Sequence, residues 1–274
     1  MRLVDAFCQE IRHGWDGVYA QCRTLDRAIE HAVGMLSSCG RRTITRTICA
    51  VGRQNQDWSA DYKFFSRSPW DEENLFIPVM KEYLNRYPSG PISAAVDDTR
   101  LHKTGKKIKT ATWQYDPMSP PFHTNLMFGL RFIQASLLFP HHREGNFSAR
   151  GFPIRFKEAP VLKKPGKRAT DEQRETYRQL YRSKNLSSQT LEVIKSIRKD
   201  FDLLGAQNRL LIVGGDGSLC NRIIFRNIPE RTHIAARCRK DARLCFPAQP
   251  PTRRIYGKEK FTPEEILKNK CIRW

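Results

Sequence analysis

Two apolar runs along the chain each lead directly into aspartate. The first, ISAAVDDTRL, ends at Asp97 and Asp98, and the second, RLLIVGGDG, ends at Asp216. Short continuous apolar runs bounded by turn residues are typical of buried strands. We therefore expect each run to form a strand with an aspartate at its end, where the core holds the backbone and the carboxylate faces solvent.

The first 88 residues show a helical pattern instead. Ile29, Val33 and Leu36 fall at helical spacing, and this pattern ends near Gly40. A basic stretch, RRTITRTICAVGRQ, and an aromatic stretch, WSADYKFFSRSPW, follow it. Short helices with basic and aromatic residues at their joints are compatible with a helix-turn-helix-like DNA-binding module. They are equally compatible with a plain helical subdomain.

The period changes after Pro91. The segments KTATWQYD, NLMFGLRFIQASLLF and RGFPIRFKE are further candidate strands. Thr170 and Gln173 have the spacing of a capping box, which predicts the start of a helix. A second helix should end at Gly205. Its apolar positions fall on one face: Leu191, Ile194, Ile197, Phe201 and Leu204.

The order of these elements predicts the fold class. Antiparallel strands precede helices, and the RLLIVGGD strand, a short helix NRIIFRN and a strand THIAARCR come after them. We expect an α/β fold, with a ribonuclease H-like mixed sheet flanked by helices and preceded by a small helical domain. The expected domains are 1–88 (helical, with DNA binding as one option), 89–240 (the core) and 241–274 (the start of an insertion region, or a tail).

The excess of basic residues limits the classes of partner that the chain is expected to bind. The chain holds 48 Lys+Arg against 28 Asp+Glu, a net charge of +20. A strong basic excess favours a polyanionic partner, here nucleic acid, over a protein that is merely soluble and basic. No stretch approaches the roughly 18 apolar residues of a membrane span. The N-terminus carries charges where a signal peptide would be apolar. We expect a cytoplasmic protein with no membrane partner.

The eight cysteines form no CxxC pair. Cys238 and Cys245 have no neighbouring histidine that would complete a zinc set. We expect reduced, mostly buried thiols and no zinc site.

Asp97 and Asp216 are the candidate metal ligands. Carboxylates from the ends of adjacent strands can converge on Mg²⁺ or Mn²⁺, which take oxygen ligands. Side chains alternate along a strand, so only one of Asp97 and Asp98 can face the site, and Thr99 shares the face of Asp97. The alternative is that these aspartates simply begin turns. The glycines around Asp216 would permit close backbone approach by a ligand.

Basic residues in two segments are candidate DNA contacts. Lys103, Lys106, Lys107 and Lys109 follow Asp97, while Arg41, Arg42 and Arg46 lie in the basic stretch of the helical region. The lysines are compatible with a row of contacts to the DNA backbone, or with a charged hairpin that is exposed to solvent. The run KKPGKR (163–168) has the same two interpretations. No chemistry is assigned to His123, His141 or His142.

Taken together, these segments resemble the DDE-type transposases of insertion sequences, in particular the DDE superfamily endonuclease domain. The resemblance rests on VDDT with the KTGKK stretch, FGLRFIQASLLFP, NLSSQTLEVIKSIR and LLIVGGDGSLCN, and on RRTITR, DWSADYKFFSR and Trp70 before them. It implies a ribonuclease H-like fold in which three carboxylates bind two Mg²⁺ ions for DNA cleavage and strand transfer. By position, Asp97 corresponds to the first carboxylate and Asp216 to the second.

The third carboxylate of the family has no counterpart in the sequence. The resemblance implies a glutamate in a Tyr-x₂-Arg-x₃-Glu-x₆-Lys pattern, which is absent; Tyr83 and Arg86 have the first spacing, but Gly90 stands at the glutamate position. Glu264 and Glu265 lie in the tail-like region. We therefore expect an incomplete transposase. The alternatives are an inactive DNA-binding remnant and a ribonuclease H-like nuclease. Expected partners are transposon-end and target DNA, with self-association or a C-terminal segment carrying the glutamate as further options.

Overall fold

A computed structural model describes residues 3–105, 107–120, 122–123, 125–143 and 146–269. The chain divides into two compact units, 1–88 and 89–274. Across the described ranges, none of the helices combines the length and apolar character that crossing a membrane would require.

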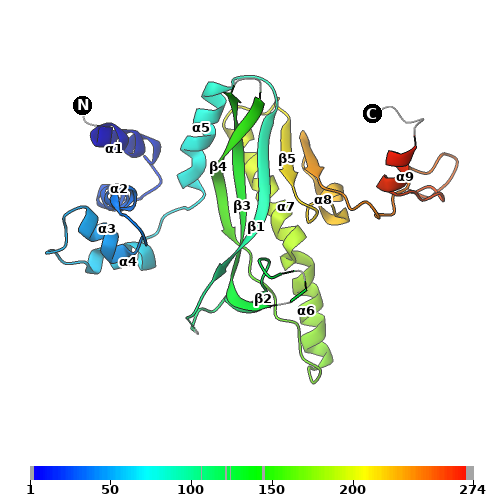
Figure 1. Cartoon of the computed structure of the whole chain (residues 1–274), viewed down its shortest axis with the longest axis horizontal. Helices are drawn as coiled ribbons and strands as arrows, with labels where there is room; N and C mark the ends of the chain where they lie inside the picture. Colours follow the sequence, from blue (N-terminus) through cyan, green and yellow to red (C-terminus); the bar gives the residue numbers. More distant parts are fainter. Residues whose placement is uncertain (1–2, 106, 121, 124, 144–145, 270–274) are drawn as a thin grey trace. The chain divides into compact units, whose positions relative to one another are not determined.

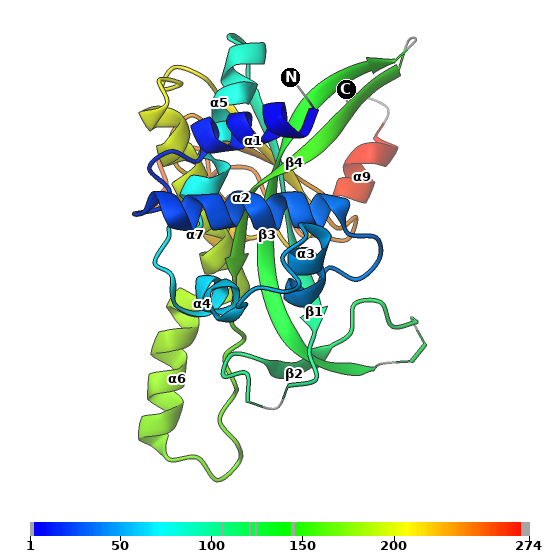
Figure 2. The same ribbon diagram turned by 90° about the vertical axis from the view of Figure 1, so that its left-hand side faces the viewer.

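Unit 1 is helical, as expected for the N-terminal region. Its elements are α1 (Leu3–Gly14), α2 (Cys22–Ser37), α3 (Ile44–Ala50), α4 (Ser59–Arg67), the 3₁₀ turn η1 (Asn74–Phe76) and α5 (Ile77–Arg86). Helices α1, α3 and α4 each contact α2 (Figure 2). The connections 38–43 and 51–58 are longer than the three to four residues typical of a helix-turn-helix. Unit 1 therefore does not have the short turn of that motif.

Helices α2 and α3 approach closely at Gly34. A Cβ added there would lie 2.5 Å from the carbonyl oxygen of Thr47. Thr43 caps α3, because its side chain accepts from the backbone N–H of Arg46. Glycine at this position therefore allows the first turns of α3 to pack directly on the α2 backbone.

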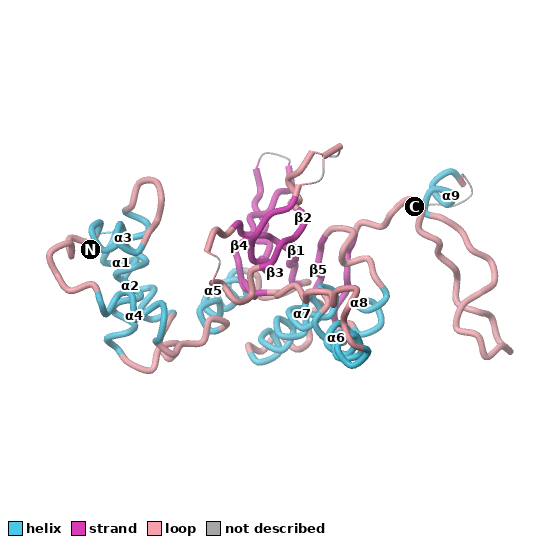
Figure 3. Tube along the Cα trace, turned by 90° about the horizontal axis from the view of Figure 1, so that it is seen from below, coloured by secondary structure: helices cyan, strands magenta, loops and turns pink. Residues whose placement is uncertain are grey.

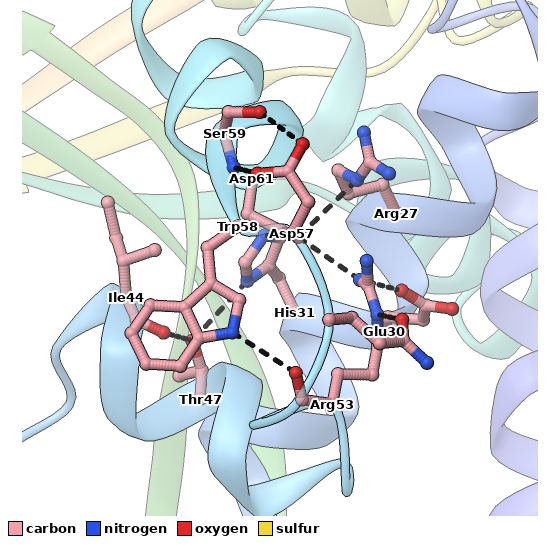
Figure 4. A network of polar contacts seen from close by, with 11 residues as sticks. Arg27, Glu30, His31, Ile44, Thr47, Arg53, Asp57, Trp58, Ser59 and Asp61 are labelled. Carbon is pink, nitrogen blue, oxygen red and sulfur yellow. Dashed lines mark hydrogen bonds and ion pairs between the residues drawn. The ribbon is translucent and has the colours of Figure 1, made fainter.

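A buried carboxylate lies between three basic side chains in unit 1 (Figure 4). The Asp61 side chain is 1% exposed, and its Oδ1 is 3.4 Å from Arg27 Nε, 3.1 Å from His31 Nε2 and 3.2 Å from Arg53 Nη1. Arg53 also pairs with Glu30 at 2.6 Å. Because Arg27 and His31 come from α2 and Asp61 from α4, the cluster joins these two helices electrostatically.

His31 is the basic residue of this cluster whose side chain can become uncharged. Burial lowers the pKa of His31; the Asp61 carboxylate opposes that lowering, and Arg27 and Arg53 add to it. His31 Nδ1 also lies 3.3 Å from the Thr47 hydroxyl. The charge that faces Asp61 is therefore supplied mainly by the two arginines.

Unit 2 is built on a mixed sheet. Its strands are β1 (Ile92–His102), β2 (Thr112–Tyr115), β3 (Leu126–Arg143), β4 (Asn146–Glu158), β5 (Leu211–Gly215) and β6 (Thr232–Ala236). Its helices are α6 (Asp171–Lys184), α7 (Leu186–Leu203), α8 (Arg222–Asn227) and α9 (Pro263–Lys268). The architecture is shown in Figure 1.

The strand pairing confirms the expected fold class. Strand β3 pairs antiparallel with β1, β2 and β4, whereas β5 is parallel to both β1 and β6. The main sheet therefore has the order β4–β3–β1–β5–β6, with β2 also on β3. An antiparallel meander followed by helices and two parallel strands is the mixed α/β arrangement of a ribonuclease H-like fold.

One expectation about β1 is wrong. Asp97 does not end the strand, because β1 continues to His102, paired with β3 from Asp97↔Gln134 to His102↔Gly129. The apolar run marks only the stretch of β1 that lies over the core. Polar residues extend the strand because β3 supplies backbone partners along its whole length.

One face of the sheet is buried under helix α7. Helices α6, α7 and α8 gather on one side of the strands of unit 2 (Figure 3). The predicted apolar face of α7 is confirmed for Leu191, Ile194, Ile197 and Phe201, which are buried, whereas Leu204 is half-buried and caps the end of the helix. Gly205 ends the segment with φ +87. Arg155 of β4 is buried against α7, where it forms an ion pair with Asp200. The capping box of Thr170 and Gln173 also forms, at the start of α6.

The cysteines are less buried than expected. The thiols of the seven described cysteines are free, but the expectation that most of the cysteines are buried is wrong for these seven; Cys271 lies outside the described residues. The exposed ones are Cys22, Cys39 and Cys49, and the half-buried ones are Cys8, Cys220, Cys238 and Cys245. The cores of both units are filled by larger apolar side chains instead, such as Phe64 and Phe201.

Removing the charge of Asp61 should destabilise unit 1. In Asp61→Asn, the basic side chains around it lose their buried counter-ion, and breaking a buried pair in this way costs about 3–5 kcal/mol. We expect hydrogen exchange in α2 and α4 to accelerate, with unit 2 unaffected.

Asp57→Asn is the matched control. Asp57 is exposed and accepts locally, from the backbone N–H of Ser59 at 2.9 Å. Equal acceleration in both variants would contradict the structural role assigned to the buried cluster.

Candidate functional site

The parallel register of β1 and β5 brings the two predicted aspartates to the same level. The last paired residues on these strands are Val96 and Gly215. Asp97 and Asp216 are the next residue on each. Neighbouring strands lie about 4.8 Å apart, so the two backbones at this level are close enough for the carboxylates to reach a common point.

Asp97 and Asp98 lie on opposite faces of β1. The buried residues Ile92, Ala94 and Val96 alternate along the strand, and Asp98 continues their face. Asp98 lies beside Arg100, with Oδ2 at 3.7 Å from Nη2. Asp97 is exposed and lies on the opposite face, as does Thr99. On β5, Ile212 and Gly214 pair with Ser93 and Ala95, the β1 residues on the face of Asp97, and Asp216 follows directly after this strand.

The turn after β5 holds Asp216 in a defined orientation. Asp216 Oδ1 accepts from the backbone N–H of Ser218 at 2.8 Å. Leu219 is 1% exposed and anchors the turn in the core. Asn221 then caps α8, accepting from the N–H groups of Ile223 and Ile224, and donates to the Ser218 carbonyl at 2.6 Å.

The glycines of this turn have a different role from the one expected. A Cβ at Gly215 would lie 2.2 Å from Leu219 Cδ1 and 2.9 Å from the Val96 carbonyl. The space beside Gly215 is therefore filled by the protein's own Leu219 rather than left for a ligand. A Cβ at Gly217 would meet only the Arg237 carbonyl, at 3.5 Å.

Within the described part of the chain, each aspartate keeps one carboxylate oxygen uncommitted. Asp97 Oδ1 accepts from the N–H of Asp98 at 2.8 Å, just as Asp216 Oδ1 accepts from Ser218. Over the described ranges, neither aspartate forms an ion pair with a basic side chain. Uncommitted carboxylate oxygens are the donors that Mg²⁺ takes, usually one or two with several waters. The two side chains therefore fit a divalent cation.

The described residues bring no third carboxylate to this place. No group of three or more His, Cys, Asp or Glu side chains with metal-binding geometry occurs among them. Glu265 is engaged in a capping box with Thr262 at the start of α9, and Glu264 pairs with Lys268 at 3.0 Å. Both glutamates are thus committed within their own helix.

The candidate DNA contacts lie in different units. Lys103 is half-buried, whereas Lys107 and Lys109 are exposed in the connection between β1 and β2; Lys106 lies outside the described residues. In unit 1, Arg41 and Arg46 are exposed. The Arg42 guanidinium donates to the Met35 carbonyl at 2.9 Å, which closes the end of α2.

Comparison with known proteins supports the resemblance. Residues 23–141 match the family model of the DDE superfamily endonuclease. This part of the chain is DDE endonuclease-like. The match includes Asp97, Arg41 and Arg42 in the loop before α3, and Arg46 in α3. It ends before Asp216. No curated protein and no solved structure matches the chain.

Sequence reasoning missed two residues that position Asp216, namely Leu219 and Asn221. Asn221 is the first residue of the NRIIFRN segment, and asparagine directly before the apolar positions of a helix is a recognisable helix-capping signal. Leu219 had no such signal, because one apolar residue in a polar turn does not reveal what it packs against.

Gly215→Ala should disturb the Asp216 turn. The added methyl group overlaps Leu219 and the Val96 carbonyl, and overpacking of this kind costs about 1–3 kcal/mol. We expect a lower urea midpoint and weaker Mn²⁺ binding.

Gly214→Ala is the control, since its Cβ would have no neighbour closer than 3.7 Å. If both variants matched the parent protein, Leu219 would not be the constraint on this turn.

Proposed function

We propose that the chain is a divalent-metal-dependent DNA transposase or endonuclease in which Asp97 and Asp216 hold the metal. The observation that supports the proposal is their placement: two exposed carboxylates that follow the last paired residues of the parallel strands β1 and β5, without a basic partner in the described ranges. In a chain of net charge +20, such a pair is a local concentration of negative charge.

The two aspartates would bind the ion through the oxygen that their backbone contacts leave open. The Asp98 and Ser218 N–H groups fix the Oδ1 atoms and so orient each carboxylate. A divalent ion bound there supplies Lewis-acid activation of a phosphate ester and of the attacking hydroxyl or water. Because β1 and the turn anchored by Leu219 are held by the core, the carboxylates keep their spacing when substrate binds.

DNA is the proposed substrate because the charge of the chain favours a polyphosphate. Lys107 and Lys109 are exposed on the connection that follows β1, the strand that carries Asp97. Lysine neutralises phosphates and releases their counterions, irrespective of base sequence. These lysines would hold the DNA backbone, and Arg41 and Arg46 of unit 1 would add further phosphate contacts.

A second candidate, a DNA-binding protein without strand-transfer activity, has one observation in its favour. Among the described residues, no group of three or more His, Cys, Asp or Glu side chains could hold a metal, whereas a two-metal site must hold ions about 3.5–4 Å apart and needs more ligands than two aspartates. We expect this chain alone to bind DNA without completing strand transfer. Adding a C-terminal segment that carries a glutamate should restore Mg²⁺-dependent nicking. Efficient strand transfer by the chain alone would eliminate this candidate.

Asp97→Asn and Asp216→Asn should each weaken Mn²⁺ binding measured by calorimetry. Loss of outer-shell groups already costs about 10–100-fold in metal affinity, so loss of a ligand should cost at least that much. Any metal-dependent nicking of supercoiled DNA should disappear in the same variants.

Asp98→Asn is the matched control, because Asp98 neighbours Asp97 but lies on the opposite face beside Arg100. Equal loss of Mn²⁺ affinity in Asp98→Asn would contradict the assignment of faces. Unchanged affinity in both Asp97→Asn and Asp216→Asn would eliminate the metal site.

DNA affinity should depend steeply on salt. If six to ten phosphates are contacted, the affinity falls about 10³–10⁵-fold between 50 and 200 mM salt. Fluorescence anisotropy with duplexes of unrelated sequence measures this slope.

A double variant, Lys107→Gln with Lys109→Gln, should flatten the logarithmic salt slope by about 0.9 for each phosphate that is no longer neutralised. The control is Lys195→Gln, since Lys195 pairs with Glu192 on α7. Affinity that does not change with salt would show that these basic residues form only a solvated surface.

A further inference from the structure

Two cysteines lie next to each other beside the Asp216 turn. Cys220 is in the turn that follows β5, where its N–H donates to the Gly217 carbonyl at 3.2 Å. Cys238 comes just after β6, which runs parallel to β5 with Gly215 opposite Ala236. Both segments therefore leave the same end of the sheet.

The side chains of these two cysteines lie near enough to influence each other. Burial of Cys220, and after it the neighbouring Cys238 side chain, raises the pKa of the Cys220 thiol, while the Cys238 thiol donates to the Arg239 carbonyl at 3.5 Å. Backbone contacts hold the segments together, because the Arg237 N–H donates to the Gly215 carbonyl at 3.4 Å. The proximity thus follows from the sheet itself and not from a chance meeting of two loops.

Small molecules can reach the pair from solvent. A surface hollow of about 420 Å³ is lined by Gly217, Arg237, Cys238, Arg239, Lys240 and Asp241. Both cysteines are partly exposed. The basic side chains that line the hollow beside Cys238, those of Arg237, Arg239 and Lys240, favour an anionic oxidant.

We infer that Cys220 and Cys238 are a disulfide-forming pair that is oxidised by a low-molecular-weight disulfide such as glutathione disulfide. Both cysteines are free in this structure, so the bond forms from the dithiol. The pair has no part in metal or DNA binding as proposed above. Any effect of the disulfide on the role of Asp216 rests on that proposed function, but formation of the disulfide itself does not.

The exchange proceeds in two balanced steps. The Cys238 thiolate, which lines the hollow, attacks one sulfur of glutathione disulfide and releases one glutathione thiolate. The Cys220 thiolate then attacks the Cys238 sulfur of the mixed disulfide and releases the second glutathione. In total, the two protein thiols lose two electrons and two protons, and one glutathione disulfide becomes two glutathione molecules.

The bond would join the Asp216 turn covalently to the end of β6. The disulfide would close a loop that contains α8 and β6. Closing a loop of this size reduces the conformational freedom that the segment gains when it opens. Amide hydrogens in residues 216–238 that exchange by local opening should then exchange at least about tenfold more slowly in the oxidised protein.

The test incubates the full chain in glutathione redox buffers, alkylates free thiols and maps disulfides by mass spectrometry. Trypsin cuts after Arg209, Arg222, Arg237 and Arg239, so the bond should link peptides 210–222 and 238–239. We expect this species to be the main intramolecular disulfide. Cys220→Ser should stop at glutathionylated Cys238, and Cys238→Ser should form no such bond.

Cys245→Ser is the control, since Cys245 is the other described cysteine of unit 2 and should be dispensable for the bond. The inference is overturned if Cys245 is oxidised as readily, if Cys238 retains glutathione while Cys220 stays reduced, or if slower exchange in 216–238 does not accompany oxidation. None of these measurements uses metal or DNA. A protein that fails to bind or cleave DNA therefore leaves this result unaffected.

Discussion

The candidate site depends on one constraint, the parallel register of β1 with β5. The two strands are far apart in sequence, and only their backbone pairing from Ile92↔Leu211 to Val96↔Gly215 brings Asp97 level with Asp216. A shift by one residue would turn one carboxylate toward the helix-covered face. The buried residues of both strands prevent that shift, because it would expose Val96 or Leu211 to solvent.

A second constraint is the contrast between local and overall charge. The chain as a whole is strongly basic, yet its two candidate ligands have no basic partner in the described ranges. Asp98, one residue away, has Arg100 beside it. The different surroundings of two adjacent aspartates follow from the pleat of β1, which places their side chains on opposite faces of the strand.

Unit 1 shows the reverse arrangement, in which a carboxylate is fully buried and compensated. Asp61 lies against Arg27, His31 and Arg53. A buried charge of this kind gives little net stability compared with apolar packing, but losing one partner is costly. It therefore acts mainly to specify how α2 and α4 associate, while Gly34 sets how closely α3 approaches α2.

The sequence by itself determined the elements whose signals are local. The apolar face of α7, the capping box of Thr170 and Gln173, the stop at Gly205 and the strands before both aspartates were predicted from periodicity and capping residues. What could not be predicted depended on partners distant in the chain. β1 extends past Asp97 because β3 pairs with it, Gly215 is required because Leu219 fills the space beside it, and Cys220 meets Cys238 because β5 and β6 are parallel. Residue patterns report burial and turns, whereas register and side-chain contacts are decided only when the strands pair.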